Sequence, residues 1–120
     1  MANGNYSILH SDDLERSGNW LLARRSLGVE AFGINMVDIE PGERIPEHDE
    51  TERDQEEVFV VLSGAAAIVI DGEEHALASG SLARLDPELT RTVVNTGSEP
   101  ARVLIVSAPR TSGYEPMPWA

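Results

Sequence analysis

One acidic segment of the chain contains the residue types that most often bind divalent metals. From Gly42 to Gly64 it reads GERIPEHDETERDQEEVFVVLSG, with His48 among carboxylates and Glu57 immediately before an apolar run. Imidazole nitrogens and carboxylate oxygens are ligands that iron, manganese, nickel and zinc accept. The chain has no cysteine, so thiolate metal sites, disulfides and cysteine nucleophiles are excluded.

Negative charge is concentrated around this histidine. Ten Asp or Glu residues lie between Asp38 and Glu57, against only Arg44 and Arg53, and the whole chain has a formal net charge of −12. For most of these acids, a solvated loop that keeps the protein soluble is the simplest interpretation. Because phosphate binding requires a basic surface, the charge argues against nucleic acid and anionic membranes as partners.

The elements that must position these residues are predicted to be strands. Short apolar runs rich in β-branched residues recur through the chain, separated by turn signals every eight to twelve residues. Asp71-Gly72 is a strong signal for a two-residue hairpin, because a type I′ turn requires positive φ. We expect seven to nine short strands in an all-β sandwich or barrel. The strands are expected near residues 32–39, 58–62, 66–70, 73–77, 82–85, 92–94 and 102–106.

The length of 120 residues fits one domain with extensions at both ends. We expect an N-terminal arm over residues 1–28, a β-barrel over 29–109 and an extended C-terminal clasp over 110–120. In the arm, Asp12 and Glu15 resemble a capping box that opens a short helix over Asp12–Ser17. The chain has no signal-peptide pattern and no apolar stretch of membrane-spanning length, which favours a cytoplasmic location.

One predicted strand is apolar on both of its faces. In Val58–Leu62, alternate side chains point to opposite sides of the sheet, and all five are apolar. The outside of a small barrel is usually wet, so the second face needs a cover. The N-terminal arm, the C-terminal clasp or another subunit could supply it, and we favour a homodimer.

The segment from Gly42 to Gly64 resembles the first sequence motif of the cupin superfamily. Gly42 is followed by five residues and then His48, and Glu57 is followed by six residues and then Gly64. A second cupin motif is matched in part farther along, at Gly80, Pro87, Arg91 and Asn95. The resemblance covers roughly residues 32–107 and implies a cupin-type, jelly-roll-like β-barrel.

Cupins typically hold a divalent metal with three histidines and one glutamate, and the resemblance maps these ligands onto this chain. His48 and Glu57 match two of them. The second histidine is replaced by Glu50, or by Glu52 or Arg53 if the loop is counted backward from Glu57. The distant fourth ligand is replaced by Arg91, whose guanidinium is always charged and cannot bind a metal. We expect Arg91 to pair with Glu57 or to bind an anionic ligand.

Three functions follow from these departures. The first is binding of a small, anionic organic molecule in a barrel whose metal site is altered or lost, with His48 and Glu57 orienting the molecule or acting as acid and base. The second is a metal-dependent oxygenase or isomerase that acts on a small organic acid, with Glu50 or Glu52 as a third ligand of Fe, Mn, Ni or Zn. The third is a non-catalytic dimeric structural or sensing module with a filled barrel. The expected ligand-binding residues are His48, Gln55, Glu57, Phe59 and Arg91.

Overall fold

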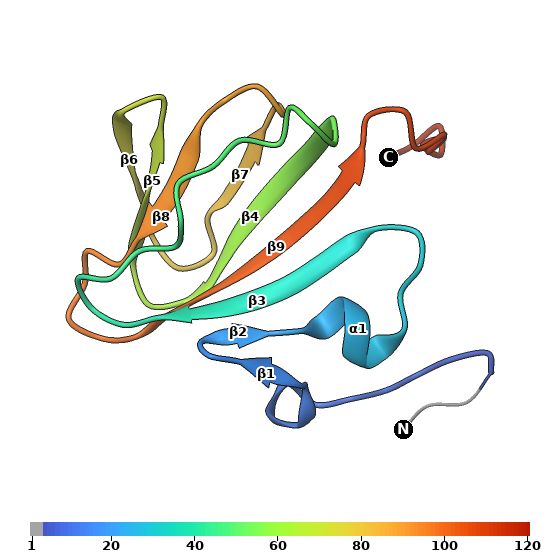
Figure 1. Cartoon of the computed structure of the whole chain (residues 1–120), viewed down its shortest axis with the longest axis horizontal. Coiled ribbons are helices and arrows are strands. Elements are labelled where there is room, and N and C mark those ends of the chain that lie inside the picture. The colour runs from blue at the N-terminus through green and yellow to red at the C-terminus, as the bar shows by residue number, and fades with distance from the viewer. Residues whose placement is uncertain (1–3) are drawn as a thin grey trace.

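The chain forms two antiparallel β-sheets (Figure 1), seen in a computed structural model that describes residues 4–120. The first three residues of the expected N-terminal arm lie outside the described residues. The larger sheet contains β1 (Arg16–Ser17), β2 (Trp20–Leu21), β3 (Gly33–Ile39), β9 (Ala101–Pro109), β4 (Gln55–Ser63) and β7 (Leu82–Leu85), in that spatial order. The smaller sheet contains β6 (Glu73–Leu77), β5 (Ala66–Ile70) and β8 (Arg91–Val94), also in spatial order. The expected all-β architecture is confirmed.

Two turns explain how short strands can follow one another so closely. Asp71 and Gly72 have φ values of 49° and 84°, as the predicted type I′ hairpin between β5 and β6 requires. Gly64, at the turn after β4, has a φ of 78°, and a Cβ at this position would lie 2.6 Å from the Pro100 carbonyl oxygen. Both the left-handed backbone and this close approach therefore require glycine at the end of the first motif.

The hydrophobic core lies between the two sheets. Along β4, Glu57, Phe59 and Val61 are buried, whereas Val58 and Val60 on the opposite face are half-buried. This alternation turns one face of the strand toward the core. The buried core cluster comprises Val37, Ile39, Ile45, Phe59, Val61, Ala66, Ile68, Leu85, Val93, Val103 and Ile105.

The N-terminal arm contains a short helix, but not where the sequence predicted it. The expected helix over Asp12–Ser17 is wrong, because only Ser11–Asp13 are helical there, as one 3₁₀ turn. Arg16–Ser17 pair instead with Trp20–Leu21 in a small hairpin that turns at Gly18, where φ is 59°. The strand pairing satisfies backbone groups that the predicted helix would have used.

The α-helix of the arm is α1 (Ala23–Leu27), and it ends at Gly28 in the left-handed conformation. Its sequence, ARRSL followed by glycine, combines good helix formers with the usual residue after a helix C-terminus. No helix among the described residues is long and apolar enough to cross a membrane.

The arm lies beside β3, where β1 and β2 extend the large sheet (Figure 1). Leu14, Leu21 and Ala23 form a second small core, against which Ile34 and Met36 of β3 pack. Farther across the same sheet, the apolar outer face continues without this cover. There Leu62 of β4 and Leu82 beside β4 on β7 are 45% and 69% exposed.

Candidate functional site

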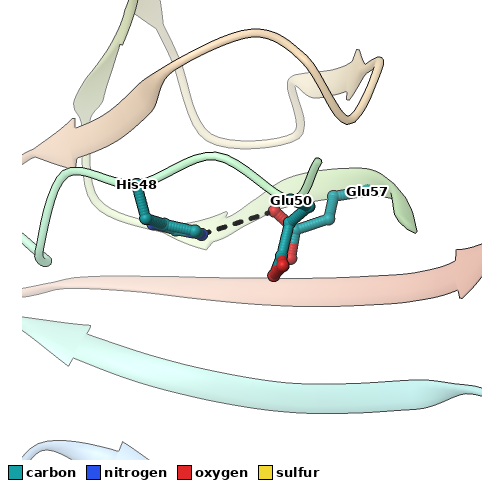
Figure 2. Close-up of side chains that lie close together, drawn as sticks. All are labelled: His48, Glu50 and Glu57. Carbon is teal, nitrogen blue, oxygen red and sulfur yellow. Dashed lines mark ion pairs between the residues drawn. The ribbon is translucent and has the colours of Figure 1, made fainter. Parts of the chain in front are cut away.

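Three side chains that could bind a metal converge near the start of β4. Glu57 projects from β4, whereas His48 and Glu50 come from the loop between β3 and β4 (Figure 2). The loop is fixed to the smaller sheet, because the His48 amide donates to the Arg91 carbonyl at 3.0 Å and the Arg91 amide donates back at 2.8 Å. The Glu50 amide also donates to the Pro87 carbonyl at 2.9 Å. Backbone pairing therefore sets the positions of both loop residues.

One ligand atom from each of His48, Glu50 and Glu57 lies within 4.8 Å of the other two. The Nδ1 atom of His48 lies 3.0 Å from the Pro46 carbonyl oxygen. A carbonyl only accepts, so Nδ1 carries the proton of the neutral ring and Nε2 has a free lone pair. That lone pair faces Oε1 of Glu57 at 3.7 Å, so two acceptors confront each other. A cation between them would satisfy both.

Arg91 lies behind Glu57 and is fully buried. Its Nε is 3.6 Å from Glu57 Oε1, and these are the two buried side-chain atoms within residues 4–120 that have no hydrogen-bond partner. The terminal nitrogens of Arg91 donate instead to backbone carbonyls, Nη2 to Asp86 at 2.9 Å and Nη1 to Pro87 at 3.4 Å. The guanidinium is thus anchored by the chain and only approaches the carboxylate.

The surroundings of Glu57 raise the pKa of its carboxyl group. Burial raises the pKa of this carboxyl, and the neighbouring Glu50 carboxylate raises it further, while Arg91 and His48 oppose the shift. A raised carboxyl pKa means that the negative charge at this position is under-compensated by the protein alone. A divalent cation would compensate both carboxylates.

The donor set fits a divalent transition metal. One imidazole and two carboxylates provide three protein ligands, and such sites leave further coordination positions for water or substrate. Arg91 does not occupy the place of the ion, because its terminal nitrogens are bound to carbonyls and its Nε approaches the side of Glu57. Arg91 stands at the motif position of the fourth metal ligand and places its charge beside Glu57.

A cavity of about 470 Å³ opens next to these side chains. It lies where β3 and β4 begin and β9 ends, and α1 and the segment before β3 border it. Its lining residues are Trp20, Arg24, Glu30, Ala31, Phe32, Gly33, Ile34, Asn35, His48, Glu50, Arg53, Gln55, Glu57, Ile105, Ser107 and Pro109. The candidate ligands are therefore accessible to a small molecule.

Of the remaining residues expected to bind a ligand or a metal, one lines the cavity and the rest do not. Gln55 lines the cavity. Phe59 is fully buried in the core, and neither it nor Arg91 is among the lining residues. Glu52 is exposed and is not part of the three-residue cluster, so the structure brings Glu50 rather than Glu52 to His48 and Glu57.

Sequence reasoning missed the contribution of the N-terminal arm to the cavity. No sequence motif indicated that Trp20 or Arg24 belongs to the site. Trp20 both packs against the core and lines the cavity, together with Arg24 and Phe32. The arm precedes the motif that revealed the site, and no local pattern in it indicates a ligand.

Comparison with known proteins agrees with this geometry. The model of the cupin domain family matches residues 35–107. None of the curated proteins matches the sequence. A cupin protein from Bacteroides fragilis has a similar structure, with a TM-score of 0.79, 23% identity, and 96% of this chain and 93% of that chain covered.

Two other solved structures are of proteins whose names state an activity. A sugar phosphate isomerase from the cupin superfamily of Silicibacter pomeroyi gives a TM-score of 0.71 at 25% identity, covering 85% of this chain and 75% of that one. A predicted oxalate decarboxylase from Thermotoga maritima gives 0.72 at 17% identity, covering 86% and 99%. With the family model matching most of its length and its sheets arranged as in these proteins, the chain belongs to the cupin family.

Proposed function

We propose that this cupin binds a small anionic organic molecule in its barrel cavity, beside a divalent cation held by His48, Glu50 and Glu57. The observation that carries the proposal is the pair of facing acceptors, His48 Nε2 and Glu57 Oε1, 3.7 Å apart at the wall of a cavity. Glu57 Oε1 has no hydrogen-bond partner, and Glu57 is too buried for water to solvate it fully. Iron, manganese, nickel and zinc all suit this donor set.

The bound cation would act as a Lewis acid on an oxygen of the organic molecule. The chain's own residues prepare the site for it. The Pro46 carbonyl fixes the tautomer of His48, and Arg91 places a buried positive charge 3.6 Å from Glu57. Gln55 and Asn35, both at the cavity wall, can orient the molecule by hydrogen bonds.

The named activities of two structural neighbours support the class of molecule. A sugar phosphate and oxalate are both small organic anions. An anion was one of the two partners expected for Arg91, and the placement of that residue changes this part of the proposal. Because Arg91 is fully buried and does not line the cavity, its role here is to place a positive charge beside Glu57.

Metal binding is the direct test. The chelator-treated protein is titrated with Fe²⁺, Mn²⁺, Ni²⁺ and Zn²⁺ in turn, and bound metal is measured by elemental analysis and by calorimetry. We expect one ion per chain for at least one metal. His48→Ala removes a ligand and should weaken binding by more than the roughly 10- to 100-fold that indirect contacts cost.

The matched control is His75→Ala. His75 also lies beside a glutamate, with Nε2 3.3 Å from Oε1 of Glu73, but this pair is solvent-exposed on β6 and lines no part of the cavity. Its loss should leave metal affinity unchanged. A wild-type protein that binds none of the four ions, or equal affinities in the His48 and His75 variants, would contradict the proposal.

The approach of Arg91 to Glu57 also favours a second candidate, the non-catalytic module. In that case the arginine replaces the metal as the partner of the carboxylate, and the barrel needs no ion. The cavity of about 470 Å³ beside the pair counts against a filled barrel. The metal titration separates the two, because the module would bind no ion with one-to-one stoichiometry.

We also propose that two copies associate through the outer face of β4, β7 and β9. Val58, Val60 and Leu62 of β4 lie on this face, next to Leu82 of β7, and the arm covers only the part over β3. Leu82 is 69% exposed, which is unusual for a leucine within an apolar sheet face.

Leu82→Glu tests this association by light scattering after gel filtration. A charge at the centre of the patch should convert a dimer to a monomer, and the circular dichroism spectrum should stay unchanged because the side chain is exposed in the single chain. A wild-type protein that is monomeric, or a variant that remains dimeric, would contradict the proposed interface.

A further inference from the structure

Two arginines at the cavity are not used by the proposed cation site. Arg24 lies on α1 in the N-terminal arm, and Arg53 lies just before β4, and both line the cavity that contains His48, Glu50 and Glu57. The six arginines that form ion pairs with carboxylates are Arg16, Arg25, Arg84, Arg91, Arg102 and Arg110. Within residues 4–120, Arg24, Arg44 and Arg53 have no such pair, so two of the three arginines left over line one cavity.

This placement stands out because the protein is strongly acidic. With 21 acidic residues for nine arginines, an arginine without a carboxylate partner is the exception. Arg24 donates once, from Nη1 to the Val29 carbonyl at 3.2 Å, and no hydrogen bond of the Arg53 side chain is found among the described residues. Both guanidinium groups therefore retain donors for a ligand.

The charge of the cavity depends on the cation, so the inference rests on the proposed function. Besides the two arginines, the acidic lining residues are Glu30, Glu50 and Glu57. A divalent ion neutralises Glu50 and Glu57, and the two arginines then outnumber Glu30. An anion that the net charge of −12 repels at long range would be attracted inside the cavity.

The cavity wall also contains an apolar part. Trp20, Phe32, Ile34 and Ile105 are among the residues that line it. A volume of about 470 Å³ is in the range of small-molecule sites. A molecule that contacts both the cation and the arginines must present polar groups at both ends and can be carbon-rich between them.

We infer that the ligand of this cavity is a two-ended organic anion, with one oxyanion at the cation and a second, a carboxylate or a phosphate, held by Arg24 and Arg53. Planar guanidinium groups bind both kinds of oxyanion through paired N–H donors. The N-terminal arm is then part of the binding site, although it lies outside residues 35–107 that match the family.

The test compares ligands that differ only at the second end. Calorimetry on the metal-loaded protein measures the affinities of glutarate, a five-carbon dicarboxylate, and of valerate, the five-carbon monocarboxylate. We expect glutarate to bind about 10-fold more tightly or better, from two charge-assisted contacts. A third probe, 4-phosphonobutyrate, keeps the chain length of glutarate and carries a phosphonate at one end, so its rank against glutarate compares the two kinds of oxyanion without a change of length.

Arg24→Gln and Arg53→Gln remove the charge and leave a shorter, polar side chain. Each should weaken glutarate binding about 3- to 10-fold and leave valerate nearly unchanged, as expected for partly exposed charge pairs. Arg44→Gln is the matched control, since Arg44 is also without a carboxylate partner but does not line the cavity. Glu30→Gln should tighten glutarate binding, because it removes the competing acid.

Metal affinity is measured on every variant, which separates two failures. A wild-type protein that binds no cation overturns the proposed function. A metal-loaded protein that binds glutarate and valerate equally, or that loses its preference as readily through Arg44→Gln as through the cavity variants, overturns the two-ended anion alone.

Discussion

Two carboxylates of the large sheet each lie beside an arginine, and their pKa values are shifted in opposite directions. Asp38 on β3 accepts from Arg102 Nε at 2.7 Å and Nη2 at 3.0 Å, and from Arg16 at 3.0 Å. Glu57 on β4 has Arg91 Nε at 3.6 Å and no hydrogen bond between them. The hydrogen bond from Arg102, followed by that from Arg16, lowers the pKa of Asp38 despite partial burial. Burial raises the pKa of Glu57.

The two pairs differ in whether the arginine makes hydrogen bonds to the carboxylate. At Asp38 the protein satisfies the charge completely, by a two-point contact across paired strands. At Glu57 the arginine Nε stays 3.6 Å from the carboxylate, and the terminal nitrogens donate to backbone carbonyls instead. A buried charge that the chain leaves unsatisfied is a position where something else is expected to bind.

Removal of Arg91 should have the largest effect. Arg91→Met leaves Glu57 without its nearby positive charge and removes the donors to the Asp86 and Pro87 carbonyls. We expect the free energy of unfolding to fall by about 3–5 kcal/mol, as when one partner of a buried pair is lost. Urea unfolding measures it, and Arg44→Met is the control at an exposed arginine. A loss no greater than the control's would show that Arg91 does not support the fold.

Asp38→Asn should have a smaller effect with a defined pH dependence. The variant loses its charge-assisted bonds to Arg102 and Arg16, and we expect a loss of about 1–2 kcal/mol at pH 7 for this partly exposed pair. Folding lowers the pKa of Asp38, so its stabilisation is complete above the unfolded value of about 3.9 and disappears as the pH falls through the lower folded value.

Urea unfolding of wild type and Asp38→Asn at several pH values checks the sign. The gap between the two proteins should be constant from neutral pH down to roughly pH 5 and should close below about pH 4. A gap that widens on acidification would mean that the folded state does not favour ionised Asp38.

Glu57→Gln should have the smallest effect on stability. In the metal-free protein the substitution removes an under-compensated buried charge, and Arg91 keeps its hydrogen bonds to the Asp86 and Pro87 carbonyls, so the free energy of unfolding should change by less than about 1 kcal/mol. Metal affinity should be lost in the same variant. If Glu57→Gln costs as much stability as Asp38→Asn, the two carboxylates do not differ in the way proposed.

The fold could be predicted because its signals are local. Asp71-Gly72 requires its hairpin, and the β-branched runs fix most strands to within a few residues. The arm was mispredicted because the same residues, Asp12 to Ser17, can cap a helix or pair as a strand, and the contact with β2 decides between them.

The site could be predicted only in part for a related reason. Motif spacing identified His48, Glu57 and Arg91, but the choice of Glu50 over Glu52 depends on how the loop pairs with β8 and the segment before it. The terminal donors of Arg91 are taken by carbonyls four and five residues earlier in the chain, which spacing does not reveal. That Arg24 and Arg53 have no carboxylate partner can be seen only when the ion pairs of the other arginines are known.

The position of α1 outside the matched family region has an evolutionary consequence. The candidate cation ligands lie within the matched region, whereas Arg24 sits on a helix of five residues that ends at Gly28, before the strands of the barrel. On the proposal above, substitutions in this helix would change ligand choice and leave the cation centre intact. Such a division lets selectivity diverge by mutation of the arm alone, while the barrel stays under constraint.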